Sequence, residues 1–91
     1  MYYECHISID LHPVSARTLI EALNGWSYSC IQGDPILGKS VYEYATRHTS
    51  CKTEFEIVIK HLTETANLIK AQGFPVVRQK IELVLYDKKE V

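Results

Sequence analysis

The chain has 91 residues, which is enough for one domain and too few for two. Its composition, 46% hydrophobic and 23% charged, is ordinary for a soluble globular domain. Ten basic residues face eleven acidic ones, a balance that excludes a general attraction to nucleic acid or to an anionic membrane.

Residues 2–10 alternate between apolar and polar side chains, and this period of two predicts a strand with one buried side. The apolar side consists of Tyr3, Cys5, Ile7 and Ile9. The polar side consists of Glu4, His6, Ser8 and Asp10. The functional question is whether this polar side is a binding surface or only the solvated side of a strand.

A short helix is predicted over residues 15–24, after a break at Pro13. Ser15 can cap its N-terminus, and Asn24-Gly25 supplies a left-handed conformation at its end. Between these two signals, apolar residues recur at helical spacing: Ala16, Leu19, Ile20 and Leu23.

A second strand is predicted over residues 26–31, which are rich in aromatic and β-favouring side chains. A loop containing Gly33 and Gly38 separates it from a third strand over residues 39–48. We therefore expect these two strands to form a hairpin.

Two alternatives remain for the side of the third strand that faces the helices. The first buries Tyr42 and Tyr44 and exposes Val41, Glu43, Ala45 and Arg47. The second buries Val41 and Ala45 and exposes Tyr42, Tyr44, Thr46 and His48. We favour the first, because the second would turn Glu43 toward the helices, where an unpartnered carboxylate is costly.

A long amphipathic helix follows, and Thr49 or Ser50 can cap its N-terminus. Its apolar stripe consists of Phe55, Val58, Ile59, Leu62, Ala66 and Ile69. Gly73, with Pro75 just beyond, marks its end.

The last strand is predicted over residues 76–86, so a single domain spans residues 1–86. One side of this strand carries Val77, Ile81, Leu83 and Leu85. The other side carries Arg78, Lys80 and Glu82. Residues 87–91 are polar, and we expect them to form a frayed C-terminal tail.

The order strand, helix, strand, strand, helix, strand predicts an α+β protein with the ferredoxin-like βαββαβ arrangement. Right-handed crossovers then give an antiparallel four-stranded sheet in the order 4-1-3-2. Both helices should cover one face of this sheet and leave the other face open.

This topology brings polar residues of the first and last strands together. His6 is expected opposite Lys80, where cross-strand Cβ atoms lie about 4.5–5.5 Å apart. The same register creates a patch with both signs of charge and one group that titrates near neutrality. The predicted patch consists of Glu4, His6, Ser8, Arg78, Lys80 and Glu82. Arg47 joins the predicted binding residues, because its segment leads into the N-terminus of the second helix, which attracts anions.

Two His-x-Ser units, His6-Ile7-Ser8 and His48-Thr49-Ser50, resemble the paired His-x-Ser/Thr units of the two-histidine phosphoesterases. In that family one histidine acts as base and the other as acid, while the hydroxyls hold phosphate oxygens. This resemblance makes His6 and His48 the catalytic residues of an enzyme hypothesis. The spacing does not require a metal site at the two histidines, and we predict neither a metal nor a cofactor.

Three cysteines, an odd number without a Cys-x-x-Cys pair, indicate a reduced protein of the cytoplasm. Cys5 and Cys30 are expected in the core. Cys51 is expected at the start of the second helix, where the helix dipole would activate its thiol and His48 could act as a base. The N-terminus lacks the features of a signal peptide, and no apolar stretch approaches the roughly 18 residues of a membrane span.

Two stretches, Tyr3–Ile9 and Gly73–Glu82, resemble the opening and closing strands of a group of short bacterial proteins of unassigned function. Those strands have the patterns Tyr-Glu-x-His-Val/Ile-Thr/Ser-Ile and Gly-Phe-x-Val-x-Arg-x-Lys-Ile-Glu. A third stretch, Thr46-Arg47-His48, is similar to a Thr-Gly-His of the same group, with arginine in place of the glycine. The resemblance implies no known activity.

From these observations we predict a small binding or regulatory module, present as a homodimer. Its open sheet face would bind an anionic small molecule or a protein partner, through the charges of Arg78 and Lys80 and hydrogen bonds of His6. The alternatives are a phosphoesterase-like enzyme and a structural subunit without a ligand.

Overall fold

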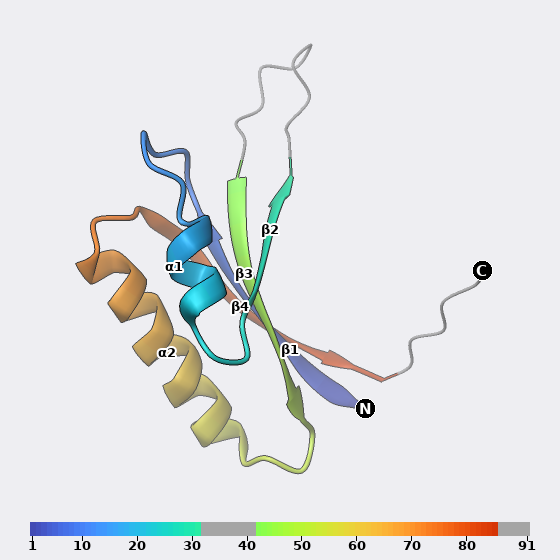
Figure 1. Ribbon diagram of the computed structural model, residues 1–91. Helices are drawn as coiled ribbons and strands as arrows, with labels where there is room; N and C mark the ends of the chain where they lie inside the picture. Colours follow the sequence, from blue (N-terminus) through green and yellow to red (C-terminus); the bar gives the residue numbers. More distant parts are fainter. Residues whose placement is uncertain (32–41, 86–91) are drawn as a thin grey trace, which may run out of the picture.

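The alternating N-terminal segment folds as a strand, β1 (Tyr2–Ile9), in the computed structural model, which describes residues 1–31 and 42–85. The other described elements are α1 (Arg17–Ala22), β2 (Ser27–Ile31), β3 (Tyr42–Ser50), α2 (Phe55–Ala71) and β4 (Val76–Val84). The protein is therefore α+β, with the predicted order of elements (Figure 1). The predicted loop around Gly33 and Gly38 and the predicted tail over residues 87–91 lie outside the described residues.

The four strands form one antiparallel sheet in the order β2-β3-β1-β4. This is the predicted order, counted from the other edge of the sheet. Both helices lie on one side of the sheet (Figure 1), and we call the other side the open face. Neither helix in the described part of the chain combines the length and the apolar character needed to cross a bilayer.

The core lies between the helices and the centre of the sheet. Ile7 and Ile9 of β1 are fully buried, together with Ile20 of α1 and Ile69 of α2. Burying a side chain of this size stabilises a fold by roughly 1.5–3 kcal/mol. The apolar side of β1 and the stripe of α2 therefore supply much of the driving force for folding, as their spacing predicts.

The predicted helix ends are partly wrong. α1 is shorter than expected, because Leu23 already has an extended backbone. α2 begins only at Phe55, because β3 continues to Ser50 and a turn follows it. Cys51 therefore lies in that turn and not at the start of a helix. The C-terminal end of α2 is as predicted, since Gly73 has a φ of +93° and its N–H donates to the carbonyl of Lys70.

Our preferred orientation of the third strand is wrong. Glu43 is only 7% exposed and Ala45 is fully buried, so these residues face the helices. Tyr42 and Tyr44 lie on the other side and are half-buried. The described residues of the strand adopt the alternative that we considered costly, because the carboxylate of Glu43 has partners; Val41 lies outside the described residues.

Three donors surround the carboxylate of Glu43. The hydroxyl of Ser15 donates to Oε2 at 2.5 Å, and the hydroxyl of Tyr28 donates to the same oxygen at 2.6 Å. The backbone N–H of Ala16 donates to Oε1 at 3.1 Å. Burial by itself would raise the pKa of Glu43, but these hydrogen bonds outweigh it and hold the pKa below its ordinary value.

The outer strand β4 also departs from the predicted alternation. A bulge opposite Ser8 and Ile9 shifts the register, so that Val76 packs against the core and Val77 is 53% exposed. Several other apolar residues expected to face inward are exposed: Phe55, Ile59, Leu83 and Leu85. Cys30 is exposed as well, whereas Cys5 is buried as predicted.

Candidate functional site

The register of β1 with β4 is the one that the sequence predicts. His6 pairs with Lys80, Glu4 pairs with Glu82, and Ser8 pairs with Arg78. On the other side of β1, strand β3 adds residues that the preferred orientation had turned away. Thr46 lies opposite His6, Tyr44 opposite Ser8, and His48 opposite Glu4. The candidate site is therefore wider than expected and extends across the open face.

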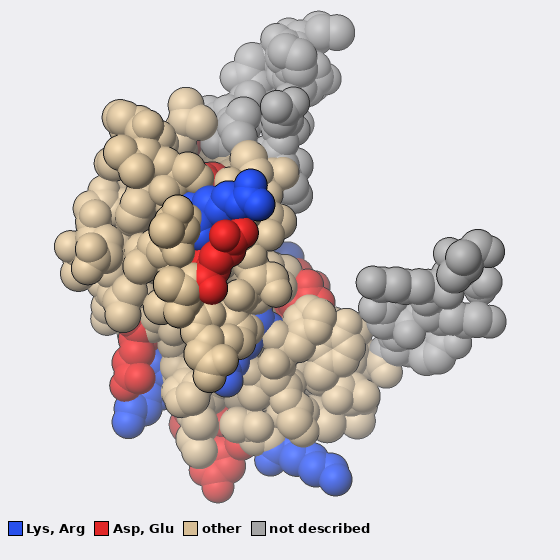
Figure 2. All heavy atoms as spheres, in the orientation of Figure 1, with Lys and Arg blue, Asp and Glu red and all other residues tan. Residues whose placement is uncertain are grey.

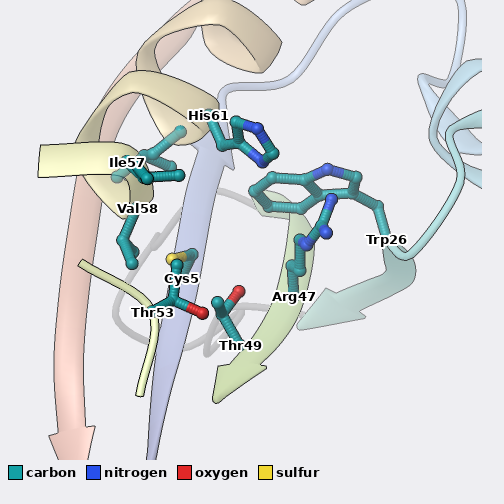
Figure 3. A pocket seen from close by; sticks show the side chains of 9 residues that line it. Cys5, Trp26, Arg47, Thr49, Thr53, Ile57, Val58 and His61 are labelled. Carbon is teal, nitrogen blue, oxygen red and sulfur yellow. The ribbon is translucent and has the colours of Figure 1, made fainter. Parts of the chain in front are cut away.

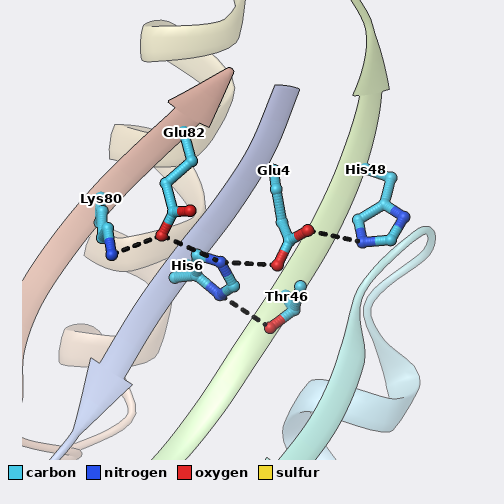
Figure 4. A network of polar contacts seen from close by, with 6 residues as sticks. All are labelled: Glu4, His6, Thr46, His48, Lys80 and Glu82. Atoms are coloured by element: carbon cyan, nitrogen blue, oxygen red, sulfur yellow. Dashed lines mark hydrogen bonds and ion pairs between the residues drawn. The ribbon is translucent and has the colours of Figure 1, made fainter. Parts of the chain in front are cut away.

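His6 is held at both nitrogens of its ring (Figure 4). Its Nε2 lies 2.8 Å from Oε1 of Glu4, and its Nδ1 lies 3.1 Å from Oγ1 of Thr46. A carboxylate can only accept, so Nε2 carries a proton, and in the neutral ring Nδ1 accepts from the threonine hydroxyl. His6 thus connects β1 to β3 and has no ring nitrogen left for a ligand.

The carboxylate of Glu4 lies between the two histidines of the open face. While Oε1 contacts His6, Oε2 lies 3.4 Å from Nε2 of His48. The ring of His48 also packs on the ring of Tyr2, with centroids 4.8 Å apart. His6 and His48 are therefore on the same face and share one carboxylate, as Figure 4 shows.

The cations of β4 differ in their surroundings. Lys80 forms an ion pair with Glu82, and this hydrogen-bonded charge lowers the pKa of the Glu82 carboxyl. Arg78 forms no ion pair with any carboxylate of residues 1–31 and 42–85. Arg78 is also exposed, so its guanidinium is the cation of the described open face that is most available to an anion.

A shallow depression of about 470 Å³ covers the centre of the open face. Its lining residues come from all four strands and comprise Glu4, His6, Ser8, Ser29, Tyr44, Thr46, Arg78, Lys80 and Glu82. A second hollow of about 360 Å³ continues it past Tyr42 and Val77. The two hollows share Ser8, Tyr44 and Arg78, so these three residues lie where they meet.

One cross-strand row runs from Arg78 on β4 to the far edge of the sheet and carries a hydroxyl group on each of the other three strands. Arg78 pairs with Ser8, Ser8 pairs with Tyr44, and Tyr44 pairs with Ser29. We call these four residues the hydroxyl row. Sequence reasoning missed Tyr44 and Ser29, although the rejected orientation of the third strand would have indicated Tyr44.

Arg47 does not belong to this site, which corrects the sequence-based prediction. Odd-numbered residues of β3 face the helices, and Arg47 lines a hollow on that side with Trp26 and Cys5. The segment around Arg47 also does not lead directly into a helix N-terminus, because residues 51–54 intervene before α2. Arg47 is therefore separated from Arg78 by the sheet itself.

Charged side chains of both signs are scattered over the side of the molecule drawn in Figure 2, without a broad patch of one sign among the described residues there. In the described part of the chain, no three His, Cys, Asp or Glu side chains are arranged to hold a metal ion. A comparison with protein-family models, with curated proteins and with solved structures finds no match to this chain. The chemistry of the site therefore rests on its own residues.

Proposed function

We propose that the protein binds a small anionic molecule at the hydroxyl row of its open face. The observation that carries this proposal is the exposed guanidinium of Arg78, which forms no ion pair within the described residues and lines one hollow with Ser8, Tyr44 and Ser29. A guanidinium presents two parallel N–H donors that match a phosphate or carboxylate group. Hydroxyls can satisfy the remaining oxygens.

The neighbouring residues have a supporting role in this proposal. Lys80 and His6 are already engaged with Glu82 and Glu4, so they contribute shape and local charge more than direct contacts. Tyr42 and Val77 line the adjoining hollow and offer an apolar surface next to Arg78. A ligand that carries an anionic group and a flat or apolar body would use both hollows.

The test is a titration of isotope-labelled protein with phenyl phosphate, followed by backbone amide shifts. We expect the largest shifts at Ser8, Tyr44 and Arg78. Replacing one charged partner of a hydrogen-bonded ion costs about tenfold or more in affinity, so Arg78→Gln should weaken the Kd by at least that factor. The matched control is Arg47→Gln, which removes the same charge on the opposite side of the sheet and should leave the Kd unchanged.

Shifts confined to other surfaces, or an unchanged Kd in Arg78→Gln, would contradict the proposed site. A protein with no response to phenyl phosphate in either variant or in the wild type would favour the structural-subunit alternative. Replacing His6 and Lys80 together should then leave every phenotype of the protein unchanged.

The phosphoesterase alternative has one supporting observation, since His6 and His48 lie on the same face and share the carboxylate of Glu4. Against it, both ring nitrogens of His6 are engaged within the protein, and an acid–base catalyst needs one within reach of the substrate. The test of this alternative is the hydrolysis of a chromogenic phosphodiester. Activity that is lost in His48→Ala and retained in the control His61→Ala would support it.

The order of elements and of strands supports the ferredoxin-like assignment. We also propose that the protein acts in the cytoplasm and belongs with the short bacterial proteins that it resembles. The exposed side chains of Leu83 on the outer strand and of Leu85 just beyond its end support a homodimer, which sedimentation analysis of the full chain would test.

A further inference from the structure

The helix-covered side of the sheet contains a separate hollow of about 180 Å³, which we call the Arg47 pocket (Figure 3). Its lining residues are Cys5, Trp26, Arg47, Thr49, Thr53, Ile57, Val58, His61 and Leu62. They come from β1, β3 and α2 and from the segments just before β2 and α2. No residue of this pocket belongs to the site on the open face.

The pocket exists because the two helices pack on different strands. α2 contacts β1 and β4, whereas α1 contacts β2. The second half of β3, which carries Arg47 and Thr49, lies between these two contacts. Trp26 and the first turns of α2 then form the walls on either side.

The inner wall of the Arg47 pocket is apolar. Trp26, Val58 and Leu62 are buried among its lining residues, and Cys5 contributes a thiol. Burial raises the pKa of the Cys5 thiol, so the sulfur is neutral near neutral pH. The wall therefore offers no negative charge to compete for the nearby cation.

The positive charge of the pocket is the guanidinium of Arg47. Arg47 is half-buried, and its guanidinium rests against the backbone of Gly25, where a Cβ would lie 3.3 Å from Cζ. Gly25 also has a φ of +84°. A side chain there would be disfavoured both by this backbone conformation and by the close contact with Arg47. Within residues 1–31 and 42–85, Arg47 has neither a hydrogen bond nor an ion pair with a carboxylate.

A half-buried cation without a counter-ion is an unusual arrangement, because desolvated charges are normally paired. Here the cation borders an apolar hollow. Two of its lining residues on α2, Ile57 and His61, are exposed, so the hollow is open to solvent on that side. An anion that enters with an apolar body would satisfy the guanidinium and fill the hollow at the same time.

We infer that the Arg47 pocket binds a small carboxylate with an apolar body, such as one aromatic ring or a short branched chain. An apolar cavity of about 150 Å³ is large enough for a benzene ring, so this hollow accommodates a body of that size. A carboxylate fits the planar fork of Arg47 with a single charge. A phosphate dianion would cost more to desolvate against the apolar wall.

The wild-type protein provides a direct test, because Trp26 is its single tryptophan and lines the pocket. One indole N–H resonance therefore reports on this site. We expect benzoate to shift that resonance in a saturable way, and benzyl alcohol, which has the same ring without the charge, to bind about tenfold more weakly. An indole resonance that responds to neither compound, or equally to both, would overturn the inference.

A pair of variants separates this site from the one on the open face. Arg47→Gln should lose the preference for benzoate over benzyl alcohol, and Arg78→Gln should retain it. If Arg78→Gln abolishes the indole shift instead, benzoate acts from the open face and the Arg47 pocket is not its site. If benzoate does not shift the indole resonance of Trp26, the result of the phenyl phosphate titration is unaffected. The two proposals are therefore tested independently.

Discussion

The charged residues on the two faces of the sheet differ in their burial and in their hydrogen-bond partners. On the helix-covered face, Glu43 is almost fully buried and receives three hydrogen bonds. On the open face, the carboxylates of Glu4 and Glu82 are partly exposed and contact histidine or lysine side chains. A buried carboxylate requires a complete set of donors, whereas a solvated one is stabilised mainly by water. Exposure, and not charge alone, therefore decides how specific the partners of a carboxylate must be.

The largest difference should appear between neighbouring residues of β1 that point to opposite faces. Ile7→Ala removes a fully buried side chain and should lower the free energy of unfolding by about 2–5 kcal/mol. His6→Ala removes contacts on the open face and should lower it by less than about 1 kcal/mol. Urea denaturation of the two variants measures this contrast. Comparable losses would mean that the open face also contributes to the stability of the core.

The second comparison concerns the carboxylates. Glu43→Ala leaves three donors without an acceptor, so we expect a loss of about 2–3 kcal/mol in the free energy of unfolding. The matched variant Glu82→Ala removes an exposed carboxylate and should have a much smaller effect. Chemical denaturation at neutral pH measures both. Equal effects would argue that the hydrogen bonds of Glu43 only offset the cost of its burial.

The smallest expected effect is a dependence on pH. Because the pKa of Glu43 is lower in the folded protein, the unfolded chain takes up the proton more readily as the pH falls. The contribution of Glu43 is thus complete above its ordinary pKa of about 4.3 and is lost as the pH falls through the lowered value. Glu43→Gln should flatten this part of the stability profile. For Glu82, whose pKa is also lowered but by an exposed ion pair, added salt should reduce the effect.

Local patterns predicted much of the fold and the centre of the open face. The alternation in β1 identified Cys5, Ile7 and Ile9 as buried but not Ser8, which is only 8% exposed. The order of elements gave the sheet order and the pairing of His6 with Lys80. These features depend on periodicity and on general rules of chain connection, which a single sequence contains.

The errors arose where a residue's environment depends on distant parts of the chain. The donors to Glu43 come from Ser15, Ala16 and Tyr28, at least 15 positions away, and no local pattern indicates that they converge. The alternation of β4 alone does not indicate the bulge that turns Val77 outward. The turned strand then moved Arg47 to the opposite face from the one expected.

The hydrogen bonds of Glu43 also have a consequence for the order of folding. α1 has only six residues, far fewer than an isolated helix needs to persist in water. The two residues just before it, Ser15 and Ala16, are hydrogen-bonded to the carboxylate of Glu43 on β3. We therefore expect the first crossover of the chain to become ordered together with β3, in one cooperative step.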